Sequence, residues 1–494
     1  MNKSIIFMII FIANLISTFN LFHNHNSLNN ISSIENCTTI IVMNDASFDG
    51  GIIVAKNRDL SELELQWLYY SPRKFHPPRS KVKLQYIEIP QAPVTWAWIG
   101  SKSYTKKWGI GMGINEWGLI IVDNDAPTRE PLEGIKGLHD NDICRLVLER
   151  CRTAYDAVLF IGELIETYGH SFTGEIYVVA DPNECWIVEA AGHHWAAIKI
   201  RSGIKVIANQ FQITTQWNLA SPDLIEYAIK MGWCKSPEEF NFAKCYSPPS
   251  YPYKSSITRI NRALNLLKPK IGNITINDII KVLSDHYEGT SMYRKPPHQN
   301  KSYRTICTKR TVASMIAHLR KWLPRQLQLI WYCMSSPCIS IYIPIYSAVT
   351  MIPEPYKNGI GNNWEHYDPK SAWWIFKKLQ TIIDSNYDNL HPIVREKWDK
   401  LFNQIISETV KFEEEILRLI NQGRENEAIN LINNFTSEKL FKAYYTAKQL
   451  ISELTMKAGR PKTKPLLDIQ VIVALLITLT IALMIHFNLK YIKR

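Results

Sequence analysis

The sequence predicts an α+β globular domain, a helical region and one C-terminal transmembrane helix. Short apolar runs bounded by turn-forming residues, at 37–42 and 51–55, are typical of paired β-strands. The segment 154–168 has its apolar residues at helical spacing. An apolar run at 469–489 has the length of a membrane-spanning helix. With 494 residues, the chain is long enough for two or three domains.

The first 36 residues have the pattern of a removable leader. Lys3 precedes the apolar run 5–16, which has signal-peptide length and is short for a membrane span. Residues 17–36 are polar and rich in Asn and Ser, so we interpret 1–36 as a signal peptide with a short pro-segment. Alternatively 5–22 stays as an anchor, and a second cut is then needed to free residue 37.

Residues 37–355 alternate between strand and helix patterns. Turn-forming residues at 44–50 join the first two predicted strands, and Asp181-Pro182-Asn183 joins a second predicted hairpin. The predicted strands are Cys37 to Val42, Gly51 to Ala55, Glu175 to Val179 and Cys185 to Ala190. The predicted helices are Asp142 to Cys151 and Ala154 to Tyr168.

Cys37 stands at the start of the first predicted strand, directly after the leader. If the chain is cut after Asn36, Cys37 carries both a thiol and a free α-amine. An α-amine has a pKa of ~8, so it can take the thiol proton near neutral pH and activate the sulfur as a nucleophile. Two other interpretations remain open. Cys37 can be a small buried apolar residue, or it can be half of a disulfide; nine cysteines are an odd number, so one of them would stay unpaired.

Short motifs follow Cys37 in a specific order between residues 37 and 346. They include Cys37-Thr38-Thr39, Lys56-Asn57-Arg58-Asp59, Gly113-Ile114-Asn115-Glu116-Trp117-Gly118, Ala180-Asp181-Pro182-Asn183, Ile207-Ala208-Asn209, Arg304-Thr305-Ile306-Cys307 and Trp331-Tyr332. Each motif alone is weak, but the ordered set resembles the C69 (U34) dipeptidase family and its secernin relatives, which are N-terminal-nucleophile (Ntn) hydrolases. The resemblance implies a four-layer αββα sandwich and a cysteine peptidase that hydrolyses dipeptides or short peptides.

Amide hydrolysis and the resemblance together suggest the catalytic residues. Cys37 is the expected nucleophile and its own amine the base, with Asp59 as the carboxylate that orients the amine. Asn209 and Asn115 are the expected donors to the developing oxyanion. Asp59 can instead be an ordinary strand-end carboxylate, and Asn115 can be a turn-forming residue.

Three further residues are expected to bind substrate. Lys56 lies where related N-terminal-cysteine hydrolases commonly have arginine, and secernins also have lysine there; lysine cannot bind a carboxylate in the bidentate manner of arginine. Arg304 is expected to bind a substrate carboxylate, although Arg310 competes for this role. Glu116 is the third candidate, and it can equally be a loop carboxylate.

The sequence predicts no metal ion, cofactor or nucleic acid partner. His193 and His194 are adjacent, and neighbours on a strand point to opposite faces, which suits zinc poorly. No HExxH or Cys-x-x-Cys motif is present. The net charge of +12 is spread along the chain without an Arg-rich run. Cys333 and Cys338 stay unassigned, although they could form a disulfide.

The C-terminal part is expected to contain helices and a membrane anchor. Residues 356–457 form the predicted helical region, which can be a stalk, a partner surface or, as we favour, a layer packed on the enzyme. A linker at 458–465 leads to a transmembrane helix at 466–489 and a basic tail at 490–494. The 21-residue apolar run would span about 31 Å as a helix. An exported N-terminus then predicts a cell-membrane protein with an extracellular catalytic domain.

Two other functions remain open at this stage. One is hydrolysis of N-acyl amides, as in penicillin V acylases. The other is a non-catalytic, secernin-like interaction protein that keeps the fold. The expected partners are peptide substrates and the membrane, and the sequence gives no oligomeric state.

Overall fold

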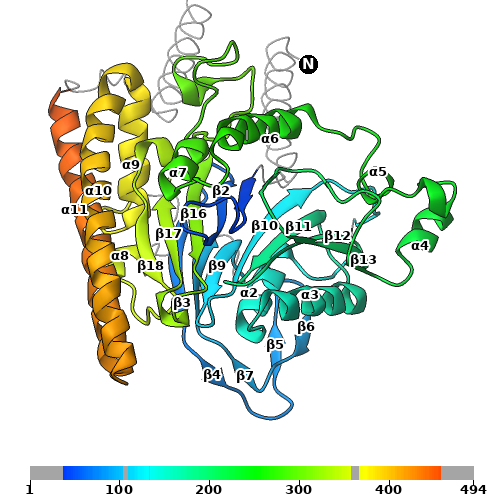
Figure 1. The fold of residues 1–494 in the computed structure, drawn as a ribbon. Coiled ribbons are helices and arrows are strands. Elements are labelled where there is room, and N and C mark those ends of the chain that lie inside the picture. Colours follow the sequence, from blue (N-terminus) through cyan, green and yellow to red (C-terminus); the bar gives the residue numbers. More distant parts are fainter. Residues whose placement is uncertain (1–36, 104–108, 133, 358–366, 458–494) are drawn as a thin grey trace, which may run out of the picture.

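The computed structural model describes residues 37–103, 109–132, 134–357 and 367–457, which form two stacked antiparallel sheets flanked by helices (Figure 1). The six-stranded sheet comprises, in spatial order, β14 (Ile204–Ile207), β1 (Thr38–Val42), β2 (Ile52–Asp59), β16 (Thr311–Leu319), β17 (Leu329–Met334) and β18 (Ile343–Tyr346). The eight-stranded sheet comprises β15 (Leu219–Ala220), β13 (His194–Ile200), β12 (Cys185–Ala191), β11 (Gly174–Ala180), β10 (Ile120–Ala126), β9 (Met112–Asn115), β8 (Trp98–Ser103) and β3 (Gln66–Ser71). Two small ribbons pair β4 (Lys74–Phe75) with β7 (Val94–Thr95) and β5 (Lys81–Lys83) with β6 (Glu88–Pro90).

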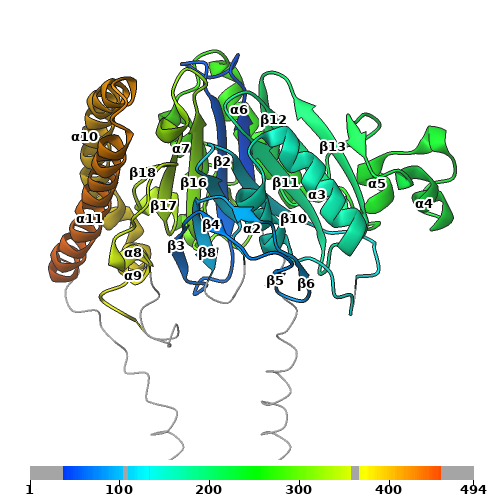
Figure 2. The same ribbon diagram turned by 90° about the horizontal axis from the view of Figure 1, so that it is seen from below.

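Helices cover the outer faces of both sheets and complete four layers. The eight-stranded sheet contacts α2 (Asp140–Arg150) and α3 (Ala154–Tyr168), and the six-stranded sheet contacts α6 (Lys254–Leu267) and α7 (Ile276–Leu283). In Figure 1, α6 lies above and α3 below the strands, and Figure 2 shows the molecule from below, with α3 in front. Shorter helices are α4 (Leu224–Lys230), α5 (Phe242–Tyr246), η1 (Pro237–Glu239), η2 (Lys268–Lys270), η3 (Pro297–Gln299), η4 (Arg325–Leu327) and η5 (Pro337–Ile339).

Local sequence explains the main elements. The run of β1 is rich in β-branched residues, and all five of its residues are buried between neighbouring strands and layers. Thr153 is the N-cap of helix α3, and its side chain accepts a hydrogen bond from the Asp156 backbone N–H; Thr275 with Asp278 forms a capping box on α7. One apolar core fills the space between the sheets, and a second lies between the eight-stranded sheet and helices α2 and α3.

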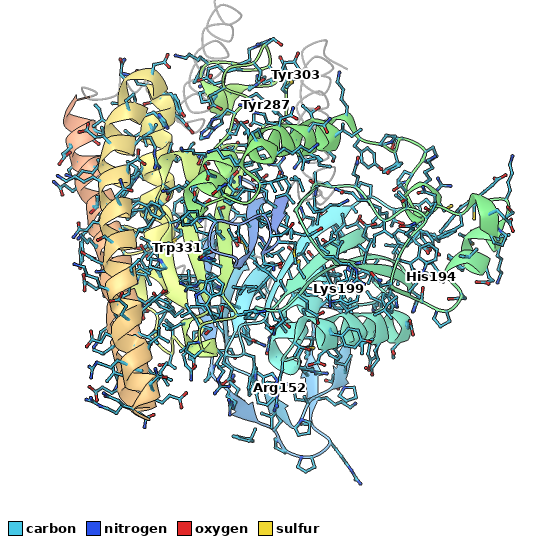
Figure 3. All side chains as sticks on the ribbon, viewed as in Figure 1. Arg152, His194, Lys199, Tyr287, Tyr303 and Trp331 are labelled. Carbon is cyan, nitrogen blue, oxygen red and sulfur yellow. The ribbon has the colours of Figure 1, made fainter. Side chains whose placement is uncertain are left out.

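The helical region packs against the six-stranded sheet on the side where β17 and β18 lie. It comprises α8 (Glu354–Lys357), α9 (Ala372–Ser385), α10 (Tyr387–Asn421) and α11 (Glu425–Lys457). Trp331 of β17 contacts Phe402 of α10 with their ring centroids 5.5 Å apart (Figure 3). Arg320 and Glu413 form an ion pair at the same interface, with a nitrogen–oxygen distance of 2.7 Å. These contacts agree with a layer packed on the enzyme rather than a separate stalk.

The predicted C-terminal transmembrane helix requires a correction. Within the described ranges, no helix combines the length and apolarity needed to cross a membrane. The longest helix, α10, buries residues at helical spacing and exposes the intervening charged residues, so it is amphipathic. The described residues therefore support a four-layer sandwich with a packed helical region, and they give no support to the predicted membrane partner or to the predicted cell-membrane location with an extracellular catalytic domain.

Several predicted segments lie outside the described residues. They are the signal peptide and pro-segment at 1–36, the linker at 458–465, the span at 466–489 and the tail at 490–494.

Candidate active site

Cys37 lies at the point where three segments of the six-stranded sheet meet. Thr39 in β1 is paired with Ile207 in β14 on one side and with Lys56 in β2 on the other. Continuing both antiparallel registers by two residues brings Cys37 beside Asn209 and beside the end of β2. The Cys37 side chain is fully buried. Strand pairing therefore positions the nucleophile candidate beside Asn209 on one side and opposite Arg58, the neighbour of Asp59, on the other.

Arg259 of α6 connects these segments through its guanidinium. It donates to the Cys37 carbonyl oxygen at 2.6 Å, to Thr38 Oγ1 at 2.8 Å and to Asn209 Oδ1 at 3.0 Å. Burial lowers the pKa of Arg259 to about 10; the nearby Arg304 charge also lowers it, and the Asp59 charge opposes this shift. Arg259 could not be predicted from the sequence, because nothing in its local pattern separates it from the other basic residues of an amphipathic helix.

Asn209 and Asn124 present two amide groups near Cys37. The Asn209 Nδ2 group donates to the Asp125 carbonyl oxygen at 2.9 Å, so the Asn209 amide is held at both ends. Asn124 Oδ1 accepts from Thr39 Oγ1 at 2.6 Å, and Thr39 shares a strand face with Cys37. The Asn124 Nδ2 group is buried and has no hydrogen-bond partner within the described part of the chain. Asn124 was not among the site residues predicted from the sequence.

Asp59 ends β2 as a buried carboxylate. It accepts from Thr311 Oγ1 at 2.5 Å and forms an ion pair with Arg304, whose side chain is 21 % exposed. Arg304 also donates to the Thr305 carbonyl oxygen. The two predicted residues are therefore brought together, and both charges act on Arg259 beside Cys37.

Lys56 is fully buried between the two sheets. Its ammonium forms an ion pair with Asp123 of β10 and donates to the Gly111 carbonyl oxygen at 3.3 Å. Cys144 of α2 contacts the same carboxylate, with 3.6 Å between Sγ and Oδ2. A buried carboxylate needs such a cation, so these contacts give Lys56 a structural role.

Asn115 and Glu116 lie at the turn that joins β9 to β10. The Asn115 amide donates to the carbonyl oxygens of Leu148 and Cys151 and accepts from the backbone N–H groups of Trp117 and Leu119. These hydrogen bonds satisfy both the donor and the acceptor of the Asn115 amide, which favours a turn-forming role for this residue. No described contact of the two side chains involves Cys37.

Glu116 forms an ion pair with the partly exposed Arg73 and accepts from the Ala97 backbone N–H at 2.7 Å. Lys56 lies in β2, the strand that pairs with β1 next to Cys37, and it contacts Gly111 just before β9. Asn115 is the last residue of β9, about 13 Å further along that strand. The structure therefore does not bring Asn115 and Glu116 to the predicted nucleophile.

The paired histidines do not converge on one point. His193 contacts the Glu166 carbonyl oxygen at the surface, whereas buried His194 stacks on Tyr227 with ring centroids 3.9 Å apart. Two other groups of metal-type side chains do converge within the described residues. One is His286, His298, Cys307 and Cys338, and the other is Asp125, Asp140 and Glu175.

Comparison with known proteins gives a family match over most of the chain. The profile of peptidase family C69 matches residues 36–257 and 251–400. The chain is 25% identical over 395 residues to "Probable dipeptidase B" of Lactococcus lactis subsp. lactis (strain IL1403), covering 71% of this chain and 82% of that protein. It is 24% identical over 409 residues to "Probable dipeptidase A" of Streptococcus pyogenes serotype M3 (strain SSI-1), covering 72% and 84%.

Two solved structures show weaker likeness. A mutant of conjugated bile acid hydrolase from Clostridium perfringens has a TM-score of 0.38 and 14% identity, and covers 63% of this chain and 92% of its own. Penicillin V acylase from Agrobacterium tumefaciens has a TM-score of 0.35 and 13% identity, and covers 63% and 86%.

Proposed function

The chain belongs to peptidase family C69 and is a peptidase, and from this premise we propose that it is a dipeptidase whose nucleophile is Cys37. Its proposed substrates are dipeptides or short peptides, and the two similar bacterial proteins are named as probable dipeptidases. The proposal requires cleavage of the Asn36–Cys37 bond, because an amide nitrogen inside a peptide bond is not a base.

The nucleophile and its base come from the same residue. Once Cys37 is the first residue, its α-amine takes the thiol proton while Sγ bonds to the substrate carbonyl carbon. Collapse of the tetrahedral intermediate breaks the carbon–nitrogen bond, and the departing amine takes the proton from the α-ammonium. Water then hydrolyses the thioester and restores the thiol. The Arg259 guanidinium favours this chemistry because it fixes the Cys37 carbonyl oxygen at 2.6 Å and adds positive charge beside the thiolate.

Asn209 is the proposed oxyanion donor, and Asn124 is its proposed partner. Arg259 and the Asp125 carbonyl oxygen fix the Asn209 amide before substrate binds, and such preorganisation is what stabilises developing charge. The buried Asn124 Nδ2 group supports a second donor, because a buried amide N–H without a partner costs stability unless a ligand satisfies it. Asn115 remains a prediction, although its turn contacts favour a structural role.

The charged residues divide into positioning and binding roles. Asp59 is proposed to orient the α-amine, and Thr311 and Arg304 hold its carboxylate. The partly exposed Arg304 is proposed to bind a substrate carboxylate from the same position. Lys56 and Glu116 keep their predicted substrate-binding roles only as proposals, because both are engaged in the ion pairs described above.

One observation carries the proposal: the registers around β1 and the bonds of Arg259 gather Cys37 and Asn209 from distant parts of the chain. The test is a substrate panel on the purified enzyme. Dipeptides, longer peptides and N-acyl amides are incubated at equal concentration, and the released amines are quantified. The proposal expects the highest kcat/KM for dipeptides. Preferential cleavage of N-acyl amides would contradict it.

A further inference from the structure

Two cysteines and two histidines from separate segments meet in a buried cluster. His286 follows α7, His298 lies in η3, Cys307 precedes β16 and Cys338 lies in η5. One ligand atom from each of these four residues lies within 4.8 Å of the others, and all four residues are buried. Both cysteines are free thiols.

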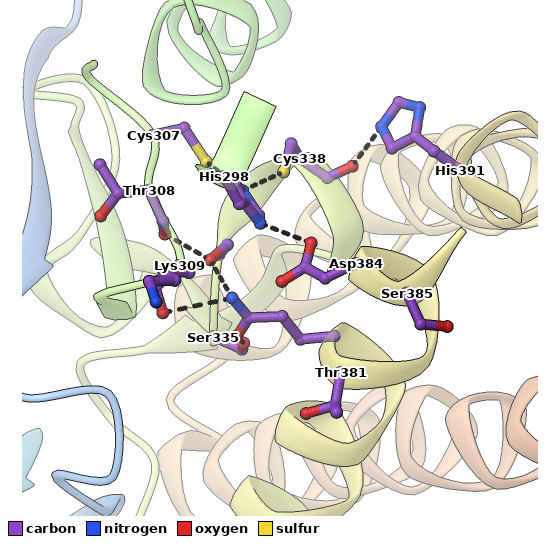
Figure 4. A network of polar contacts seen from close by, with 12 residues as sticks. His298, Cys307, Thr308, Lys309, Ser335, Cys338, Thr381, Asp384, Ser385 and His391 are labelled. Atoms are coloured by element: carbon purple, nitrogen blue, oxygen red, sulfur yellow. Dashed lines mark hydrogen bonds and ion pairs between the residues drawn. The ribbon is translucent and has the colours of Figure 1, made fainter. Parts of the chain in front are cut away.

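The distances within the cluster suit a small cation at its centre. Cys338 Sγ lies 3.3 Å and Cys307 Sγ lies 3.9 Å from His298 Nε2 (Figure 4). In a tetrahedral zinc site the ligand atoms are separated by about 3.3–3.8 Å, given zinc–sulfur bonds of ~2.3 Å and zinc–nitrogen bonds of ~2.0 Å. The cluster therefore has nearly the dimensions of such a site.

A carboxylate orients each imidazole toward the cluster centre. Asp384 of α9 contacts His298 Nδ1 at 2.7 Å, and Glu288 contacts His286 Nδ1 at 2.8 Å. This arrangement directs both Nε2 atoms inward, as in carboxylate–histidine–zinc sites. The His286 side chain is 1 % exposed, and among the described residues its Nε2 atom makes no hydrogen bond of normal geometry, although the Cys307 thiol lies close to the ring. A buried ring nitrogen of this kind needs a ligand.

We propose that His286, His298, Cys307 and Cys338 bind one zinc-class divalent cation in a closed tetrahedral site. Zn²⁺ is the cation that this set of two thiolates and two imidazoles favours, and the two thiols release their protons when it binds. Four protein ligands leave no open position, so the site is structural rather than catalytic. A cysteine–histidine–aspartate triad would account for Cys338, His298 and Asp384, but not for the second thiol or the second imidazole.

The cation would cross-link a long irregular connection next to the active site. Residues 284–310 join α7 to β16 and contain only the three-residue helix η3. The same connection carries Arg304, which pairs with Asp59, and Tyr287, which donates to the Arg304 carbonyl oxygen at 2.6 Å. Binding at Cys307 would therefore hold Arg304 in place. The metal proposal itself stands on the four ligands and does not depend on the peptidase proposal.

The first experiment measures the metal content of the purified full chain. We expect about one zinc ion per chain by elemental mass spectrometry, either as purified or after addition of Zn²⁺ and removal of excess. The double variant Cys307→Ser, Cys338→Ser should lose this stoichiometric binding, whereas Cys185→Ala, which removes a buried thiol elsewhere, should retain it. Wild-type protein that holds no zinc and takes up none would overturn the proposal, as would peptide mapping that finds a Cys307–Cys338 disulfide.

The second experiment uses Co²⁺ as a spectroscopic probe and remains decisive if the double variant does not fold. Wild-type protein loaded with Co²⁺ should show the intense visible bands of tetrahedral cobalt and a thiolate-to-cobalt charge-transfer band. The milder variant Asp384→Asn should weaken metal affinity by about 10- to 100-fold, because it changes only the orienting carboxylate. An octahedral cobalt spectrum without a thiolate band would show surface binding only and would overturn the site.

Discussion

The Cys37 site and the cysteine–histidine cluster hold buried thiols in two different ways. Cys37 precedes a central strand, and backbone pairing on both sides of β1 fixes its position. The thiols of Cys307 and Cys338 come from loops and a single short helical turn. In the first region the sheet supplies the rigidity. In the second region side chains must supply the rigidity, and four side chains that bind one cation would supply it.

The same difference separates what each region can do. Cys37 has a strongly basic guanidinium beside it and two side-chain amides nearby, which suits a nucleophile that attacks a carbonyl group. The cluster has two thiols and two imidazoles facing one centre, which suits a cation. We therefore expect substitutions at Cys37 to abolish chemistry with little effect on stability, and substitutions in the cluster to act on stability first.

The largest expected effect is at the nucleophile. Cys37→Ala should reduce kcat by at least about four powers of ten, because no other group replaces the sulfur, and Cys37→Ser should remove most activity because a hydroxyl is harder to ionise. Thermal unfolding should stay close to wild type. Cys185→Ala is the matched control and should keep its activity. Turnover by the Cys37→Ala variant at the wild-type rate would show that another residue is the nucleophile.

The next effect concerns the oxyanion donors. Asn209→Ala should lower kcat by about two to three powers of ten with a smaller change in KM, because the donor acts mainly on the charged transition state. Asn124→Ala should show the same pattern if its buried Nδ2 group is the second donor. Steady-state kinetics on one dipeptide measures both. A change in KM alone would make Asn209 a binding residue and would leave Asn124 as the oxyanion candidate.

A moderate effect is expected from loss of the proposed metal. Removing the cation with a chelator should lower the unfolding temperature and reduce activity by about tenfold, because Arg304 loses its fixed position while Cys37 keeps its strand pairing. Re-adding Zn²⁺ should restore both properties in wild-type protein. Equal thermal stability before and after verified metal removal would show that the connection at 284–310 needs no cross-link.

The smallest effect is expected at Arg304. Arg304→Ala should raise KM by about three- to tenfold for substrates with a free carboxylate, since the guanidinium would bind that group in both ground and transition states. Substrates with a blocked C-terminus should show a smaller difference between variant and wild type, because only the ion pair with Asp59 is then lost. An equal loss of kcat with both kinds of substrate would show that Arg304 acts only by holding Asp59.

The sequence predicted those features that are encoded in contiguous segments. The hairpin of β1 and β2 and helix α3 follow from local patterns, and the ordered motifs pointed to Cys37, Asp59 and Asn209. Asn115 shows a limit of such motifs, because the same turn pattern serves a substrate site and a saturated turn equally well. Pattern alone could not separate the two roles.

Features assembled from distant segments were not predicted. Arg259 reaches Cys37 only because α6 packs on the six-stranded sheet, and its helix shows nothing unusual in sequence. The cluster of His286, His298, Cys307 and Cys338 follows no short metal-binding spacing, so the search for adjacent histidines and Cys-x-x-Cys pairs did not find it. Both features depend on tertiary packing rather than on local pattern.

The central claim is that the catalytic base is the α-amine of Cys37, and the mass of the N-terminal peptide from active enzyme tests it most directly. Active protein is isolated, labelled at Cys37 with a thiol-reactive substrate analogue, and digested. The labelled peptide should begin at Cys37 with an unmodified amine, and labelling should abolish activity. A labelled peptide that still carries Asn36, obtained from protein that was fully active before labelling, would contradict the assignment of the α-amine as the base.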